Sequence, residues 1–307
     1  MASVKLSTGA SMPLLGIGTW QSKPGEVEAA VRTALDLGYR LIDTAAVYGN
    51  EAEIGHVLHE YISQGKLKRS DVFITTKVWC THNRPEQIEG QLRESLAKLQ
   101  LDYVDLYLVH MPVATNLDMS AQDHTVSVVD TWRGMEGVFE KGLTKAIGVS
   151  NFSEEQVQRI YDNAKVKPHN LQFELQQLCN KLNISFTAYA PLGSPGRVHF
   201  TLPSGAKLDW APAPNPLEDP IVVKLSQKYH KTPAQILIRL MLERHMSVIP
   251  KSVNPARIKE NFEVEDFSLT AEEVAELNSV KHRQRLFGQE FCEGHAEDPF
   301  KNERSKK

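Results

Sequence analysis

The stretch Tyr39-Arg40-Leu41-Ile42-Asp43-Thr44-Ala45-Ala46-Val47-Tyr48-Gly49-Asn50-Glu51 decides the fold, because an apolar run ends in an acid and a tyrosine just before a helical pattern begins. Two later apolar runs have the same form, since residues 72–77 end in a lysine and residues 104–110 in a histidine. All three runs are short and rich in β-branched or aromatic residues, which is typical of buried strands. If these strands are parallel neighbours, their polar ends meet at the carboxyl edge of one sheet, where parallel α/β folds keep reactive groups. The side chains concerned are Asp43, Tyr48, Lys77 and His110.

A strand followed by a helix recurs along the rest of the chain. After a short hairpin at residues 4–12, the pattern predicts strands at 14–19, 41–44, 72–77, 104–110, 146–150, 171–174, 185–190 and 247–250. It predicts helices at 26–37, 51–64, 85–99 and 131–141, and another that opens with the capping residues Ser153-Glu154-Glu155-Gln156. Eight strands with intervening helices and no break between two halves favour a closed barrel over an open sheet. We therefore expect one domain over residues 1–307, an α/β (β/α)8 TIM barrel of parallel strands with an N-terminal hairpin.

Two irregular segments follow the seventh expected strand. Residues 194–220 are rich in proline and glycine, and we interpret them as an active-site loop rather than as a helix, a strand or a linker. The polar tail at residues 285–307 carries isolated Phe287, Phe291 and Phe300. We expect this C-terminal segment either to drape over the mouth of the barrel or to be partly disordered.

Composition narrows the class of protein. The 307 residues are 41% hydrophobic and 24% charged, and 35 basic against 38 acidic residues leave a net charge of −3, which suggests neither a nucleic-acid nor a membrane partner. No apolar run fits a signal peptide or the roughly 20 residues that span a bilayer, so we expect a cytoplasmic protein, and a monomer. The three cysteines are far apart and the 11 histidines lack metal-binding spacing, so we expect free thiols and no metal.

The four chemical residues have ordinary explanations when each is taken alone. Asp43 could be a cap, Lys77 a surface charge, and His110 a core histidine with its hydrogen bonds satisfied. Their recurrence at the ends of three successive strands favours a site instead. By contrast, Gly16-Ile17-Gly18 only superficially matches a dinucleotide fingerprint, because the third glycine is missing and no helix opens at once.

Several long motifs occur in an order that resembles one known family. They are Gly16-Ile17-Gly18-Thr19-Trp20, Asp43-Thr44-Ala45, Tyr48-Gly49-Asn50-Glu51, Thr76-Lys77-Val78-Trp79, the run from Asp102 to His110, Gly148-Val149-Ser150-Asn151-Phe152, Ala190-Pro191-Leu192-Gly193 and Ile249-Pro250-Lys251-Ser252. The sequence thereby resembles the aldo-keto reductase superfamily, in particular its aldose and aldehyde reductase branch. The resemblance implies an eight-stranded βα barrel that reduces small-molecule carbonyl substrates with NADPH/NADP+, and a catalytic tetrad at Asp43, Tyr48, Lys77 and His110.

The chemistry of carbonyl reduction fits these four side chains. Hydride transfer leaves negative charge on oxygen, so a donor must stabilise that charge and supply a proton. We assign Tyr48 as the general acid and Lys77 as the cation that lowers its pKa from about 10. Asp43 is expected to keep Lys77 charged, and His110 to orient the carbonyl oxygen.

The resemblance also places cofactor and substrate contacts. It implies that Ser150, Asn151 and Gln172 bind the nicotinamide amide and that Tyr189 stacks on its ring, with Thr19, Trp20, Leu192 and Ser194 also along the cofactor. It implies Lys251, Ser252, Asn254 and Arg257 at the adenosine 2′-phosphate, which suits a lysine point charge and an arginine fork, and Glu260 and Asn261 at the adenine. The residues expected to face the substrate are Trp20, Val47, Trp79, His110 and Met111, an apolar wall suited to aromatic or alkyl aldehydes.

The chain departs from the family pattern after Glu174. The usual histidine and proline are absent there and the connection is several residues shorter, which leaves room for a sixth helix of about two turns. We therefore expect poorly covered apolar barrel surface, lower stability and weaker cofactor binding. Met111 also replaces a tryptophan that many relatives carry.

Two other functions remain open on the sequence alone. One is a non-catalytic binding or regulatory barrel of the same superfamily, which an assay of NADPH consumption would separate from an enzyme. The other is covalent chemistry through a Schiff base on Lys77, which borohydride trapping would reveal.

Overall fold

Eight parallel strands form one sheet in which each strand pairs with its neighbour in the chain. The computed structural model describes residues 2–172, 175–199, 210, 212–280 and 284–304. The strands are β3 (Ile17–Gly18), β4 (Leu41–Asp43), β5 (Phe73–Val78), β6 (Leu106–Val109), β7 (Ile147–Ser150), β8 (Asn170–Gln172), β9 (Ser185–Ala188) and β10 (Ser247–Val248). The sheet closes where Leu15 pairs with Val248 and Gly18 with Lys251, both in parallel. The predicted barrel is thereby confirmed.

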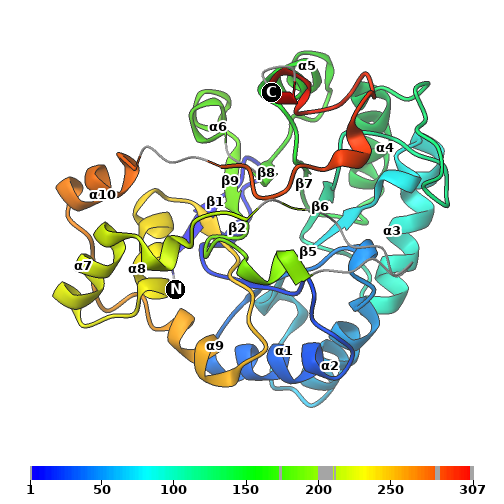
Figure 1. Cartoon of the computed structure of the whole chain (residues 1–307). Helices are drawn as coiled ribbons and strands as arrows, with labels where there is room; N and C mark the ends of the chain where they lie inside the picture. The colour runs from blue at the N-terminus through cyan, green and yellow to red at the C-terminus, as the bar shows by residue number, and fades with distance from the viewer. Residues whose placement is uncertain (1, 173–174, 200–209, 211, 281–283, 305–307) are drawn as a thin grey trace.

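Helices surround this sheet (Figure 1). Those that follow the strands are α1 (Glu26–Leu37), α2 (Glu51–Ser63), α3 (Pro85–Leu99), α4 (Val128–Glu140), α5 (Glu154–Asn163), α6 (Gln176–Leu182), α8 (Pro233–Glu243) and α9 (Pro255–Phe262), and α7 (Pro220–Tyr229), α10 (Ala271–Asn278) and α11 (Lys301–Arg304) are additional. Each long helix turns an apolar stripe to the barrel, as α1 does with Val27, Val31 and Leu35. Gly38 ends α1 in a left-handed conformation with φ 106°, as its sequence predicts.

The N-terminal hairpin covers the amino end of the barrel. Strands β1 (Ser3–Lys5) and β2 (Ser11–Pro13) pair antiparallel. Met12 is buried in a cluster with Leu41, Phe73 and Leu106, residues at the start of β4, β5 and β6. Since apolar side chains fill the amino end, a polar site is expected at the carboxyl end of the barrel.

The two glycines near the start of the barrel serve close packing, not phosphate binding. A Cβ on Gly16 would lie 2.4 Å from Leu41 Cγ, and one on Gly18 would lie 2.8 Å from the Ile249 carbonyl oxygen. Gly16 N also donates to Val248 O at 2.9 Å, across the seam that closes the barrel. Only a residue without a side chain fits this approach.

Several predicted boundaries were wrong. Helix α4 begins at Val128 rather than 131, because Ser127 and Asp130 form a capping box in which Ser127 Oγ accepts from Asp130 N at 3.2 Å. The strands are mostly shorter than expected; Val104, for instance, pairs with Thr144 only as an isolated bridge before β6 begins.

The proline- and glycine-rich insert is also more regular than predicted at its two ends. It contains the 3-10 helices η4 (Pro195–His199) and η5 (Pro216–Glu218), and α7 begins at Pro220. The middle of the expected loop, residues 200–209 and 211, lies outside the described residues.

The sixth helix is short, as predicted, but it does not leave the barrel bare. Helix α6 has seven residues, and residues 173–174, the end of the strand expected at 171–174, lie outside the described part of the chain. Leu171 and Phe186, on β8 and β9, are nevertheless buried, as are Leu178 and Cys179 of α6 itself. The predicted exposure of apolar surface is therefore wrong for the described residues, and the predicted loss of stability has no such surface to support it.

A contact between α6 and the end of α8 accounts for part of this coverage. Arg244 Nη2 donates to Gln176 Oε1 at 2.7 Å, and Gln176 Nε2 donates to the Arg244 carbonyl oxygen at 3.0 Å. These two bonds hold the short helix against a longer neighbour.

Gly55→Ala is expected to destabilise the barrel. A Cβ at Gly55 of α2 would lie 2.2 Å from the Lys98 carbonyl oxygen of α3, and backbone cannot yield as a side chain can. We expect a loss of about 1–3 kcal/mol in the free energy of unfolding, measured by urea denaturation. Gly90→Ala is the matched control, since no atom lies within 4 Å of its Cβ position, and it should gain about 0.5–1 kcal/mol. Equal stabilities for the two variants would contradict the close packing of α2 on α3.

Candidate active site

The four predicted catalytic side chains lie together at the carboxyl ends of β4, β5 and β6. Lys77 Nζ donates to Asp43 Oδ1 at 2.5 Å and to the Thr44 carbonyl oxygen at 2.8 Å. Tyr48, in the 3-10 helix η1 (Ala46–Tyr48), has its ring centroid 5.1 Å from Lys77 Nζ. The rings of Tyr48 and His110 meet edge to face with centroids 5.6 Å apart. The barrel therefore brings the four residues into one cluster.

The ion pair at the centre of this cluster is buried, and both oxygens of its carboxylate accept a hydrogen bond. Lys77 is fully buried and Asp43 is almost so. The second carboxylate oxygen, Asp43 Oδ2, accepts from Gln172 Nε2 at 2.8 Å. Because both oxygens are bonded, the carboxylate is held in one orientation, and with it the ammonium of Lys77.

The pKa of Tyr48 is displaced in the direction opposite to the one the sequence predicts. Burial raises it well above 10, and the negative charge of Asp43 and the neighbouring phenol of Tyr189 add to the rise. The net direction in this structure is therefore opposite to the lowering expected from Lys77 alone. Asp43 lies so close to the ammonium that the two form a dipole, whose field at Tyr48 is weaker than that of a lone cation. Tyr48 therefore keeps its proton firmly.

The environment of His110 favours a neutral imidazole. Burial lowers its pKa well below 6.5, and the positive charge of Lys77 lowers it further. Its main chain is fixed, since His110 N donates to Val78 O and its carbonyl oxygen accepts from Asn151 Nδ2, each at 3.0 Å. Its Nδ1 is buried and has no hydrogen-bond partner in the described part of the chain. A neutral ring can donate a hydrogen bond without adding positive charge to the site.

A chain of polar contacts extends from the tetrad across the ends of β7, β8 and β9. Tyr189 OH donates to Asn151 Oδ1 at 2.9 Å, Asn151 Nδ2 donates to Ser150 Oγ at 3.1 Å, and Ser150 Oγ donates to the Gln172 carbonyl oxygen at 3.2 Å. Gln172 in turn reaches Asp43. The residues expected at the nicotinamide are thus gathered beside the four catalytic candidates.

A second group of expected cofactor residues lies at the start of α9. Asn254 caps this helix, its Oδ1 accepting from Arg257 N at 3.1 Å, and Lys251 and Arg257 are exposed beside it. Burial of its stem lowers the pKa of Lys251, Glu26 opposes this, and the positive charge of Arg257 adds to it. Two cations near a helix N-terminus, neither in an ion pair within the described ranges, can bind a phosphate.

The other residues expected to contact the cofactor are less accessible to a ligand. Ser252 and Asn261 are buried, and Glu260 Oε1 accepts from Thr232 Oγ1 at 2.8 Å. Thr19 Oγ1 donates to the Asp43 carbonyl oxygen at 2.9 Å, while Leu192 packs against apolar residues of the core. Ser194 begins the insert with φ 46°, and its carbonyl oxygen accepts from Arg197 N at 3.0 Å.

The tail and the insert form one aromatic wall of the mouth. Phe287 packs against Trp20, Tyr189 and Trp210, with ring centroids 5.5, 5.8 and 5.2 Å apart. The buried Arg197 fastens the tail here, because its Nε donates to the Leu286 carbonyl oxygen at 3.2 Å. The described tail residues therefore drape over the mouth, as one of the two alternatives predicted, and Figure 1 shows the tail in red crossing the strand ends. Trp210 was not among the predicted site residues; an isolated tryptophan in an irregular insert was its only signal.

Trp79 lies beside His110 with partners that the sequence did not predict. Its ring lies 5.0 Å from that of His110 and 5.9 Å from that of Phe291, and its Nε1 donates to Met119 Sδ at 3.3 Å. Val47 is exposed at the rim.

Met111 does not face the mouth as expected. It is 1% exposed, in an apolar cluster with Cys80, Val113 and Cys292. Its side chain fills the space behind Trp79 and Phe291, so the prediction of a substrate contact is wrong for this structure.

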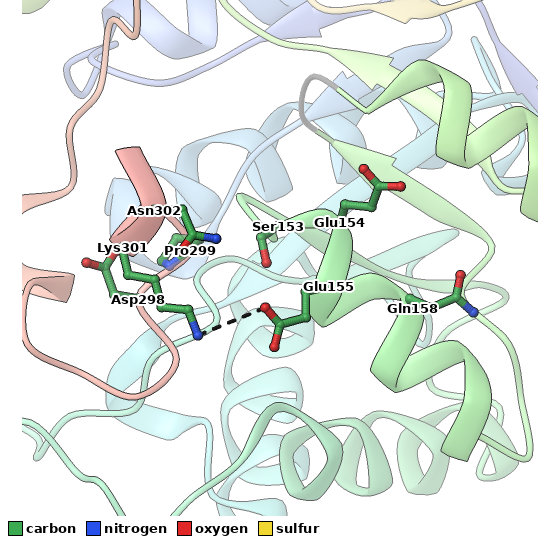
Figure 2. Close-up of a pocket in the computed structure, with 8 residues that line it drawn as sticks. All are labelled: Ser153, Glu154, Glu155, Gln158, Asp298, Pro299, Lys301 and Asn302. Atoms are coloured by element: carbon green, nitrogen blue, oxygen red, sulfur yellow. Dashed lines mark ion pairs between the residues drawn. The ribbon is translucent and has the colours of Figure 1, made fainter. Parts of the chain in front are cut away.

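A hollow elsewhere on the molecule involves none of the predicted site residues. It lies between the start of α5 and the tail, where Lys301 Nζ and Glu155 Oε2 face each other 4.0 Å apart (Figure 2).

Among the described residues no group of three or more histidine, cysteine, aspartate or glutamate side chains could hold a metal. No helix in the described part of the chain is long and apolar enough to cross a membrane.

Comparisons with known proteins agree with this geometry. The model of the Aldo/keto reductase family matches residues 14–282. Aldo-keto reductase family 1 member A1 of Gallus gallus is 44% identical over 92% of this chain and 89% of that protein, and member A1-A of Danio rerio is 43% identical over 93% and 91%.

Two solved structures share the whole architecture. The aldose reductase from Schistosoma japonicum is 41% identical with a TM-score of 0.87 and covers 99% of this chain and 100% of its own. The Bombyx mori aldo-keto reductase in complex with NADP is 36% identical with a TM-score of 0.87, over 97% and 98%. With its closed barrel and the family motifs in order, the chain belongs to the aldo-keto reductase family.

Proposed function

We propose that this protein is an oxidoreductase that reduces aldehydes or ketones to alcohols with NADPH, with Tyr48 as the general acid. The observation that carries the proposal is the convergence of Tyr48, Lys77, Asp43 and His110 at the carboxyl edge of a barrel of this family. When bound, NADPH supplies the hydride that the carbonyl carbon accepts. The test is the loss of NADPH absorbance with a reactive aromatic aldehyde, accompanied by an equal amount of the alcohol.

Tyr48 supplies the proton in this scheme. Because burial raises its pKa, the phenol stays protonated until negative charge develops on the carbonyl oxygen. Lys77, 5.1 Å from the ring, then stabilises the phenolate that remains. Asp43 keeps Lys77 charged against the burial that lowers the pKa of the lysine. The neutral ring of His110 donates a hydrogen bond that orients the carbonyl oxygen.

The residues at the two ends of the expected cofactor site fit NADPH. Lys251 and Arg257 beside the start of α9 suit the adenosine 2′-phosphate, since a phosphate pairs well with a point charge and a guanidinium fork. At the other end, Gln172 Nε2 is used by Asp43, which leaves Gln172 Oε1 for the donor of a carboxamide. Ser150, Asn151 and Tyr189 form the rest of that end.

Arg257→Ala is expected to weaken NADPH far more than NADH. Only NADPH has the extra phosphate, and a hydrogen bond between charged groups contributes about 1.5–3 kcal/mol, which predicts a rise of about 10- to 150-fold in the NADPH dissociation constant. Fluorescence titration with both cofactors measures this. Lys259→Ala, an exposed cation of the same helix paired with Glu263, is the control and should leave both affinities unchanged. Equal losses for NADPH and NADH would contradict phosphate recognition by Arg257.

The walls of the mouth favour apolar substrates. Trp20, Trp79 and Val47 come from the sequence prediction, and Phe291 and Met119 add further apolar surface around Trp79. We propose aromatic or alkyl aldehydes over bulky polar sugars, which a panel of carbonyl substrates ranked by kcat/KM would test.

The two other functions are less well supported. A Schiff base requires an unprotonated amine that a carbonyl can reach, but Lys77 is fully buried and paired with Asp43. A purely regulatory barrel would not need this buried acid–base cluster, which costs stability. Borohydride trapping and NADPH consumption test the two alternatives in turn.

We also propose that the protein works as a monomer in the cytoplasm. Few large apolar side chains are exposed in the described ranges, namely Val47, Leu117, Met119, Val198 and Val223, whereas stable dimers bury broad apolar surface. All three cysteines are free thiols. Light scattering during size-exclusion chromatography would test the oligomeric state, and cell fractionation the location.

A further inference from the structure

Asn50 and Glu51 are buried polar residues that the proposed mechanism does not use. They follow Tyr48 after one glycine, Gly49, whose φ of 67° turns the chain from η1 into α2. Asn50 is 1% exposed and Glu51 is 2% exposed. Burying a carboxylate and an amide is costly unless their hydrogen bonds are satisfied, so the contacts of this pair indicate what it holds in place.

Glu51 connects the segment that carries Tyr48 with the strand that carries Lys77. Its Oε1 accepts from Thr76 Oγ1 at 2.6 Å, and Thr76 directly precedes Lys77 in β5. Its Oε2 accepts from Ser95 Oγ of α3 at 3.1 Å. The charge of Glu51 also acts on the ammonium: burial lowers the pKa of Lys77, and the charges of Asp43 and Glu51 oppose this lowering.

Asn50 connects the same segment with the ends of β3 and β4. Its Oδ1 accepts from Thr44 Oγ1 at 3.0 Å, and its Nδ2 donates to the Thr19 carbonyl oxygen at 2.9 Å and the Ser22 carbonyl oxygen at 3.3 Å. Thr44 follows Asp43, and its own carbonyl oxygen accepts from Lys77 Nζ. The partners of Asn50 are therefore the neighbours of the ion pair.

The Tyr48 side chain meets the described cluster through its ring. Its main-chain N donates to Ala45 O at 3.0 Å within η1, and its ring meets Lys77 and His110 through ring contacts. Ring contacts act over several ångströms, whereas hydrogen bonds require a narrow range of distance and angle, so hydrogen bonds set the position of a segment more sharply. The directional bonds come two and three residues later, from Asn50 and Glu51.

We infer that Asn50 and Glu51 are positioning residues, which fix the segment of Tyr48 against Thr44 and Thr76 and so set the place of the phenol relative to Lys77. This inference rests on the proposed role of Tyr48 as the general acid. It predicts that breaking the bonds to Thr44 and Thr76 slows proton and hydride transfer without weakening cofactor binding, because the residues proposed for the two ends of NADPH lie at β7, β8, β9 and α9.

The test is a series of variants at the partners of the pair, measured by the single-turnover rate of aldehyde reduction with saturating NADPH. Thr76→Val removes the donor to Glu51 with little change of shape, and a misplaced acid should lower the rate about tenfold or more. Thr76→Ser keeps the hydroxyl and should recover most of the rate. Thr44→Val, which removes the donor to Asn50, is an independent variant and should act in the same direction.

Ser95→Ala is the matched control. It removes the other donor to Glu51, but on the side of α3, away from Lys77, so it should lower the melting temperature and leave the single-turnover rate close to that of the parent. The primary isotope effect on steady-state kcat with deuterated NADPH separates slower chemistry from a smaller folded fraction, because kcat includes product release and only slower chemistry increases its isotope effect. We expect a larger isotope effect in Thr76→Val and an unchanged one in Ser95→Ala.

The outcomes distinguish this inference from the proposed function. If the parent enzyme reduces no aldehyde, the proposed function fails first. If the parent is active and Thr76→Val and Thr44→Val both turn over at the parent rate, the inference is overturned. An equal loss of rate in Ser95→Ala and Thr76→Val would also overturn it, since Glu51 would then act only as a clamp between helices.

Discussion

Replacing Tyr48 with phenylalanine is expected to reduce aldehyde turnover by about 10²- to 10⁴-fold, the usual contribution of a positioned general acid. The substitution removes the hydroxyl and little volume. Because burial raises the pKa of Tyr48, the phenol carries its proton at neutral pH, and phenylalanine has no such proton to supply. The rate of a single turnover with saturating NADPH measures the loss directly.

Cofactor binding separates this effect from damage to the fold. The affinity of Tyr48→Phe for NADPH should stay close to that of the parent, since the expected phosphate contacts lie at α9. Tyr103→Phe is the control: its ring packs under Arg69 and Lys145 near the start of β6, at the other end of the barrel, and its turnover should match the parent. Comparable turnover in Tyr48→Phe would remove the tyrosine from the role of acid.

The barrel and its tetrad could be predicted because local signals and the final contacts agree. Each of β4, β5 and β6 is an apolar run with an ionisable residue at or next to its carboxyl end, and parallel pairing necessarily places such ends at one edge. The distances between Asp43, Lys77 and Tyr48 follow from neighbouring strands, so strand order alone brings them near one another.

Other features depend on contacts between distant segments, which no local pattern encodes. The burial of Met111 needs Cys292 of the tail, and the wall at Trp20 needs Phe287 and Trp210. Coverage of the barrel beside the short α6 likewise depends on Arg244 at the end of α8. These pairs are far apart in the chain, so the sequence suggested a substrate contact and exposed surface where the structure has packed side chains.

The pKa of Tyr48 shows a different limit of sequence reasoning. A lysine near a tyrosine predicts a lowered pKa for the tyrosine. The direction of the actual shift depends on how closely a carboxylate cancels the charge of that lysine and on how deeply the phenol is buried. Both are properties of the folded site. The presence of Asp43 was predicted; the 2.5 Å separation that weakens the field of Lys77 at the phenol was not.

Replacing Lys77 of the ion pair with methionine is expected to cause the second large loss of turnover. Removing the ammonium leaves the phenolate of Tyr48 without a nearby cation, so turnover should fall by at least about 10²-fold, comparable with the loss of the acid itself. It also leaves Asp43 buried with one oxygen unpaired, and breaking a buried pair on one side costs about 3–5 kcal/mol. A loss of activity in this variant alone would therefore mix chemistry with folding.

The double variant Lys77→Met with Asp43→Asn separates the two. The amide of Asn removes the buried charge and its side-chain oxygen can still accept from Gln172, so the melting temperature should recover most of what Lys77→Met loses. Turnover should not recover, because no cation lies beside the phenol. Melting curves and single-turnover rates on the same three proteins make the comparison. If the double variant were as stable as the parent and reduced aldehydes within tenfold of its rate, Lys77 would hold the barrel together without stabilising the phenolate, and Tyr48 would have to act with only His110 beside it.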